Sequence, residues 1–265
     1  MTDELLRSEV PVDQRLHHDD LQTSASTELS GVQLLRLQAN FLSALEASVS
    51  LLDELGVARS DYFITGGGAV FLREFGETGE SSRGPTDLDI IVKDTPAIRR
   101  VGNEIPLERL GVSQFVSARV ITFERNHHGF IFPNPVWELE TQSGFSVDII
   151  PGQMITKFPH DHWLLPGEEY RFPVDSSFIF DETTPIMIEG IGECRAGNMA
   201  FVSFYKFTMD RNTMGKQDRS DLRIMRDRGY IDTSDPQFTE FINYLLGEDL
   251  EKTQRFCAKL QETIA

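Results

Sequence analysis

The chain has 265 residues, of which 40% are apolar and 10% aromatic, so it can bury a core and is not a disordered chain. Its formal net charge is −17, from 42 acidic and 25 basic residues, which disfavours non-specific binding to nucleic acids. Two cysteines are too few for a disulfide framework or a four-cysteine metal site.

The N-terminal part, residues 1–28, is polar and mixes both charges, which predicts a loose arm. It lacks the apolar h-region of a secretory signal. No segment of the chain reaches the roughly 18 to 20 consecutive apolar residues that a membrane span needs. We therefore expect a soluble, cytoplasmic protein without a membrane partner.

From residue 29 to residue 92, apolar periodic segments alternate with turn signals. Leu35, Leu42 and Val49 belong to an apolar stripe with three- and four-residue steps, which is typical of a helix. The predicted elements in this part are a helix over 31–55, a strand over 62–64, two helical turns over 69–75, a surface loop over 77–85 and a strand over 88–92.

The rest of the chain continues with strands and then returns to helical periodicity. We predict a helix within 96–110, strands over 119–124, 136–140 and 145–150, further strands and loops over 159–190, and helices over 199–209, 218–227, 236–246 and 249–264. This order predicts an α+β (mixed α/β) fold, with a mixed sheet flanked by helices and a helical C-terminal lobe. The expected units are the arm (1–28), a core (29–158) and a C-terminal region (159–265).

Two carboxylates, Asp87 and Asp89, stand in an otherwise apolar strand. Residues two apart share a strand face, so the carboxylates project together while Leu88 and Ile90 face the other way. Like charges this close oppose each other's ionisation unless a cation lies between them. Carboxylate oxygens suit Mg²⁺, particularly when substrate phosphates complete its coordination. The motif predicts a site for Mg²⁺ (or Mn²⁺), although a solvated strand edge shows the same pattern.

A glycine run, Gly66-Gly67-Gly68, lies between the strand over 62–64 and the helical turns that follow. Glycines at such a junction let backbone amides approach phosphate oxygens, and a helix N-terminus favours negative charge. We expect a nucleoside triphosphate between these glycines and the Asp-x-Asp strand. The alternative is an ordinary glycine turn.

A third carboxylate is expected from a neighbouring strand. Asp148 is flanked by Val147 and Ile149, and a charged group within an apolar strand needs a partner or a metal. Glu138 and Glu140 compete for this role, but alternating charge is more simply explained by a solvent-facing strand. We favour Asp148.

These elements in this order resemble the polymerase-beta-type nucleotidyltransferase superfamily, and more narrowly its abortive-infection and toxin-type branch. That branch has Gly-Gly-x-Ala, then an arginine-containing loop that leads into Ser/Thr-Asp-x-Asp. The matching stretches are Gly66-Gly67-Gly68-Ala69 and Arg83-Gly84-Pro85-Thr86-Asp87-Leu88-Asp89, with Gly68 where many members have Ser or Thr. The resemblance implies that residues 29–158 form a nucleotidyltransferase-like catalytic core, in which Arg83 and Thr86 join the glycines at the nucleotide.

The branch also has a late helical block with Lys, then Arg, then Lys/Arg-x-Asp-x-x-Asp-Leu. Here the block comprises Lys206, Arg211 and the run Lys216-Gln217-Asp218-Arg219-Ser220-Asp221-Leu222. The resemblance implies that Lys206 neutralises nucleotide phosphate, that Lys216 belongs to the nucleotide site and that Asp218 orients a basic or metal-linked group. Read without the rest of the motif, the block is equally consistent with a mixed-charge surface helix.

The implied reaction transfers a nucleoside monophosphate from a triphosphate such as ATP or GTP to an acceptor hydroxyl. Asp87, Asp89 and Asp148 would be the metal ligands and Asp148 the general base. The acceptor is open, but the net charge of −17 favours a small molecule or a protein over nucleic acid. The alternatives are a toxin-like enzyme that modifies RNA or tRNA, a non-catalytic nucleotide- or partner-binding protein, and an acidic scaffold with a structural cation.

Overall fold

The computed structural model describes residues 31–93, 115–121, 130–131, 136–151, 155–156, 177–208 and 216–265. Its elements are α2 (Gly31–Glu54), η1 (Arg59–Asp61), β1 (Tyr62–Thr65), α3 (Gly66–Thr78), β2 (Asp87–Val92), β3 (Phe115–Ile121), β4 (Phe130–Ile131), β5 (Val136–Thr141), β6 (Ser146–Pro151), β7 (Ile155–Thr156), α5 (Ser177–Asp181), β8 (Thr184–Ile188), β9 (Gly192–Ala196), α6 (Met199–Thr208), α7 (Lys216–Asp227), α8 (Pro236–Leu245) and α9 (Leu250–Ile264). The predicted arm (1–28) and the predicted helix within 96–110 lie outside the described residues.

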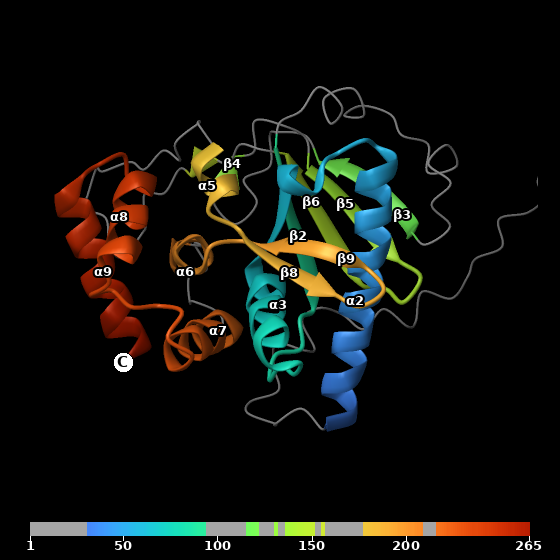
Figure 1. The fold of residues 1–265 in the computed structure, drawn as a ribbon, viewed down its shortest axis with the longest axis horizontal. Helices are drawn as coiled ribbons and strands as arrows, with labels where there is room; N and C mark the ends of the chain where they lie inside the picture. Colours follow the sequence, from blue (N-terminus) through green and yellow to red (C-terminus); the bar gives the residue numbers. More distant parts are fainter. Residues whose placement is uncertain are drawn as a thin grey trace, which may run out of the picture.

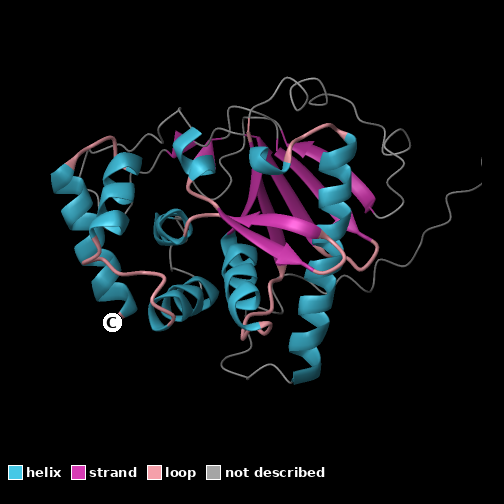
Figure 2. Ribbon diagram, viewed as in Figure 1, coloured by secondary structure: helices cyan, strands magenta, loops and turns pink. Residues whose placement is uncertain are grey.

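Seven strands form one mixed sheet in the order β3-β5-β6-β2-β1-β9-β8, and β4 pairs separately with β7. Within the large sheet β2 runs parallel to β6 and β1 parallel to β9, whereas the other neighbours are antiparallel. Figure 1 shows α2 on one flank of the molecule and α8 and α9 on the opposite flank, with α3 and α6 between them. The same arrangement is visible by element type in Figure 2. The α+β fold class is confirmed.

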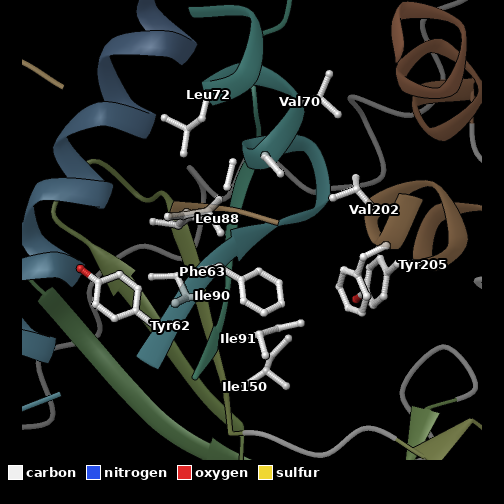
Figure 3. Close-up of a cluster of buried hydrophobic side chains, with 14 of the residues drawn as sticks. Tyr62, Phe63, Val70, Leu72, Leu88, Ile90, Ile91, Ile150, Val202 and Tyr205 are labelled. Carbon is white, nitrogen blue, oxygen red and sulfur yellow. The ribbon is translucent and has the colours of Figure 1, made fainter. Parts of the chain in front are cut away.

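Apolar side chains pack against both faces of the central strands. Tyr62 and Leu88 lie on the side of α2 and α3, whereas Phe63 and Ile91 lie on the side of α6 (Figure 3). Phe63 meets Phe201 of α6 edge to face, with 5.5 Å between ring centroids. Full burial of one such side chain stabilises the fold by about 1.5–3 kcal/mol. Packing on both faces therefore fixes β1 and β2, and with them the polar residues at the ends of these two strands.

The predicted helices of the last third correspond to α6, α7, α8 and α9, and the predicted strands over 62–64, 88–92, 136–140 and 145–150 correspond to β1, β2, β5 and β6. Two elements differ most in extent. The helix predicted over 69–75 begins at Gly66, because the left-handed φ of +61° at this glycine turns the strand directly into the helix. The strand predicted over 119–124 spans Phe115–Ile121.

Strand β9 was not predicted from the sequence. It carries Glu193 and Arg195 in alternation with buried Cys194 and Ala196, and it begins with Gly192, so its short pattern resembles a turn. Because β8 and β9 extend the sheet beside β1, the sheet does not end at the predicted boundary between residues 158 and 159.

Burial raises the pKa of both thiols, Cys194 and Cys257, to about 11, so these free cysteines stay protonated at neutral pH. Within the described ranges, no helix combines the length and the apolar character that crossing a membrane requires.

Candidate active site

Three carboxylates lie on one face of the sheet, at the edge where β1 leads into α3. Asp87 and Asp89 are two apart on β2 and share its face, while Leu88 between them is fully buried on the other face. The parallel pairing of β2 with β6 places Asp89 opposite Asp148 and Asp87 opposite Ser146. We call Asp87, Asp89 and Asp148 the carboxylate row. All three are half-buried, so each is anchored in the sheet yet reachable from outside.

The first turn of α3 lies against this row. Thr65, the last residue of β1, is the cross-strand partner of Asp89. The next residue, Gly66, starts the helix, and a side chain there would overlap Oδ2 of Asp89. The Asp89 carboxylate therefore lies beside the positive end of the α3 dipole, where backbone N–H groups have no partner inside the helix. The structure thus brings together the predicted glycine turn and the predicted Asp-x-Asp pair.

The two competing glutamates lie one strand further along. Glu138 of β5 is in register with Asp148, so the two side chains share a face, and Glu140 is in register with Ser146. Glu138 is half-buried and Glu140 is exposed. Glu140 Oε2 accepts a hydrogen bond from Ser117 Oγ at 3.2 Å. Asp148 is the candidate whose strand is adjacent to β2.

The late helical block forms a buried group of alternating charges with the arginine loop. Asp221 of α7 lies 2.6 Å from Arg83 Nε through Oδ1 and 2.6 Å from Lys206 Nζ through Oδ2. Lys206 Nζ also donates to Asp218 Oδ1 at 3.2 Å. We call Arg83, Lys206, Asp218 and Asp221 the ion-pair cluster. It contains two positive and two negative groups, and the Asp221 side chain is 0% exposed.

Burial lowers the pKa of Lys206, but the attraction of Asp221 and Asp218 exceeds this effect, so the pKa stands above the ordinary value for lysine. The ammonium group is therefore charged at neutral pH. The structure places Lys206 in contact with two carboxylates, and its predicted role at phosphate is not visible from these contacts.

The loop that carries Arg83 is fixed by neighbouring helices. Gln38 of α2 donates from Nε2 to the carbonyl oxygens of Ser81 (2.8 Å) and Arg83 (3.0 Å). The fully buried side chain of Glu74 accepts hydrogen bonds from Ser81 Oγ at 2.7 Å and Ser82 N at 3.2 Å. Arg228, after the end of α7, completes this group at 3.0 Å from Glu74. These contacts give Arg83 a defined position beside α3.

The three glycines of the motif have different neighbours. A Cβ on Gly67 would lie 2.6 Å from Arg83 Nη2, so Gly67 separates the carboxylate row from the ion-pair cluster. A Cβ on Gly68 would lie 2.8 Å from the Phe41 ring and 2.9 Å from Ile64 Cγ2, so Gly68 faces α2 and the core. A serine or threonine at position 68 could not be accommodated without a shift of these neighbours.

Two further residues of the predicted nucleotide site are placed in the chain as follows. Thr86 immediately precedes β2 and is half-buried. Lys216 is the first residue of α7.

The donor chemistry of the carboxylate row fits Mg²⁺, since three hard oxygen ligands stand on one face of two adjacent strands. In the described part of the chain, however, no three His, Cys, Asp or Glu side chains are grouped so that they could hold a metal ion. The backbone register thus suits the ligand set, while the side chains of the carboxylate row are not grouped as a formed metal site.

Sequence reasoning missed the positions of Thr65 and Glu74. Thr65 could have been noticed as a hydroxyl that ends an apolar strand directly before the glycines. Asp221 belongs to the predicted helical block and lies on the same helix face as Asp218, but the sequence assigned it no role. Glu74 had no local signal, since its partners Ser81 and Arg228 are defined only by the tertiary fold.

No protein-family model matches this chain, and no curated protein matches it either. The resemblance to nucleotidyltransferases therefore depends on the sequence motifs.

Proposed function

We propose that this chain is a metal-dependent nucleotidyltransferase that transfers a nucleoside monophosphate from a nucleoside triphosphate to an acceptor hydroxyl. The observation that supports it best is the register of Asp89 with Asp148 across two parallel strands, beside the N-terminus of α3. A solvated strand end does not require three half-buried carboxylates on one face, whereas a metal site shared by two strands does.

Each part of this edge has a chemical role in the proposal. The amides of the first α3 turn and Arg83 receive the phosphate oxygens. Asp87, Asp89 and Asp148 hold Mg²⁺ or Mn²⁺, which when bound neutralises triphosphate charge and lowers the pKa of the acceptor hydroxyl. Asp148 accepts the proton of that hydroxyl. The acceptor oxygen then bonds to the α-phosphorus as the bond to pyrophosphate breaks.

The acceptor in this proposal is a small molecule or a protein. An RNA backbone is bound by Lys and Arg side chains that displace its counterions, and a chain of net charge −17 repels RNA at long range. In addition, Lys206 is already paired with two carboxylates of the same chain, Asp218 and Asp221. Labelling of RNA 3′ ends by the protein, a labelled triphosphate and total RNA would contradict this assignment and favour a toxin-like RNA-modifying enzyme.

The test is pyrophosphate release from each of the four nucleoside triphosphates with Mg²⁺ or Mn²⁺, followed by mass analysis of the labelled acceptor. Asp89→Asn should abolish release. Asp227→Asn is the matched control, since its carboxylate is 65% exposed and pairs only with its neighbour Arg226 among the contacts seen at that surface. Nucleotide binding without pyrophosphate release in the wild-type protein would indicate a non-catalytic nucleotide-binding protein. The absence of both binding and release would refute the proposal.

A further inference from the structure

The hydroxyl of Thr65 occupies an unfavourable position for a purely structural residue. Thr65 is 0% exposed, and among the residues that the structure describes Oγ1 has no hydrogen-bond partner. A buried polar group without a partner costs about 1–3 kcal/mol of stability. Valine has nearly the same shape, favours strands and would avoid this cost. A side chain that lowers stability in this way is a candidate for contact with a ligand.

The location of Thr65 indicates which ligand. Thr65 is the N-cap residue of the 13-residue helix α3, yet its side chain makes no capping hydrogen bond. It is the cross-strand partner of Asp89, so the two side chains are neighbours on one face of the sheet. The Asp89 carboxylate lies against Gly66 at this helix end, which shows that the end accommodates an anionic group.

Of the two positions that flank Gly66 and Gly67, only the one on the strand side can carry a hydroxyl. Position 68 is closed to a serine or threonine by Phe41 and Ile64. Thr65 stands on the opposite side of the glycines, next to the carboxylate row. A hydroxyl is also an uncharged hydrogen-bond donor, so it can lie between the Asp89 carboxylate and a bound anion without adding negative charge.

We propose that Thr65 is a phosphate-binding residue, whose hydroxyl donates a hydrogen bond to a phosphate oxygen of the nucleoside triphosphate at the N-terminus of α3. This assignment rests on the proposed function, because it takes the triphosphate as the ligand of this edge. It gives the chain a substitute for the hydroxyl that Gly68 lacks.

The experiment compares wild type, Thr65→Val and Thr65→Ser by calorimetric titration with a non-hydrolysable nucleoside triphosphate and with inorganic pyrophosphate, each with Mg²⁺. Thermal melting is recorded without ligand. Thr65→Val should weaken binding of the triphosphate about tenfold, the scale of one hydrogen bond to a charged group, while its melting temperature holds or rises. Thr65→Ser keeps the hydroxyl and should bind within a few-fold of wild type.

Thr253→Val is the matched control. Thr253 is also a buried threonine near a helix N-terminus, but its Oγ1 donates to Asp249 O at 2.8 Å and lies 3.0 Å from Asn243 Oδ1. This control should melt at a lower temperature and bind the triphosphate normally, the reverse of Thr65→Val. Unchanged affinity of Thr65→Val beside a wild type that binds would overturn the Thr65 assignment alone. A wild type that binds neither probe would overturn the proposed function itself.

Discussion

Two groups of charged side chains flank the first turn of α3, and they differ in sign and in burial. The carboxylate row contains acidic groups only, and its members are half-buried at the edge of the sheet. The ion-pair cluster has two groups of each sign, with Asp221 completely buried between Arg83 and Lys206. Both groups belong to the motifs that the sequence assigns to nucleotide binding, but their physical states are different.

The two groups differ in how their charges are stabilised. Three acidic groups on one edge repel one another, so a cation improves their energy and their removal need not harm the fold. In the ion-pair cluster each charge has an opposite charge beside it in low dielectric, so the removal of one member leaves another charge buried without compensation. Charge balance and burial thus distinguish the carboxylate row, which we propose binds a ligand, from the ion-pair cluster, which links α6, α7 and the Arg83 loop.

The largest effect is expected in the carboxylate row. Asp89→Asn or Asp148→Asn should reduce pyrophosphate release by about a hundredfold or more, the scale of losing one electrostatic contact to the transition state. Without metal, the melting temperature of each variant should hold or rise, because mutual repulsion is relieved. Release assays and thermal melts in EDTA measure the two quantities. Strong destabilisation of both apo variants would show that the carboxylates are structural.

The ion-pair cluster should behave in the opposite way. Asp221→Asn leaves Arg83 and Lys206 without their shared partner and should lower the free energy of unfolding by about 3–5 kcal/mol. Urea unfolding measures this loss. Asp218→Asn is the control within the cluster, because Asp218 lies 3.2 Å from Lys206 whereas Asp221 lies 2.6 Å from it, and the loss of stability should be smaller, about 1–3 kcal/mol. Equal stability of Asp221→Asn and wild type would remove the distinction between the two groups.

The local part of this arrangement is predictable from the sequence. The apolar stripe of α2 and the alternation around Leu88 and Val147 depend only on near neighbours, so the helix and both strands follow from their periods. The choice of Asp148 over the glutamates used the same local argument, since only Asp148 interrupts an apolar strand. The structure places it in register with Asp89.

The non-local part is not predictable in this way. The parallel pairing of β9 with β1 joins residues more than a hundred positions apart, and β9 has no strong strand pattern of its own. Lys206 and Asp221 are recognisable as charged residues of a helical block, but their pairing with each other and with Arg83 depends on how α6, α7 and the loop pack. A sequence motif identifies such residues without showing whether they face a ligand or one another.

A smaller effect is expected for the loop that positions Arg83. Glu74→Gln removes the charge that Arg228 neutralises and weakens the acceptor of Ser81 and Ser82, so it should cost about 1–3 kcal/mol of stability. Glu77→Gln, one helical turn further on, is the matched control. Glu77 is 44% exposed, so its pair with Arg73 should contribute less than about 1 kcal/mol.

Urea unfolding and limited proteolysis within residues 79–86 measure the two variants. Faster cleavage in Glu74→Gln than in Glu77→Gln is expected, because the buried acceptor is what holds the loop. Equal cleavage would show that Gln38 alone fixes the loop.

The smallest effect is expected for Gly67→Ala, at the boundary where Gly66 faces the carboxylate row and Gly67 faces the ion-pair cluster. Gly66→Ala places a side chain at a φ of +61°, which costs about 1–2 kcal/mol, and displaces Asp89, so both stability and pyrophosphate release should fall. Gly67→Ala is different, because its methyl group meets Nη2 of Arg83, whose hydrogen bond to Asp221 Oδ2 is long at 3.3 Å, and alanine favours the helix by about 1 kcal/mol.

The two effects at Gly67 oppose each other. The free energy of unfolding of Gly67→Ala, measured in urea, should therefore stay within about 1 kcal/mol of wild type. If Gly67→Ala lost as much stability as Gly66→Ala, the Arg83 guanidinium could not move. The ion-pair cluster would then be as rigid as the sheet, and the triphosphate would have to fit between two fixed charged groups. A neutral Gly67→Ala instead means that Arg83 can adjust its end while Asp221 holds its Nε, which is the freedom an arginine needs to follow a phosphate.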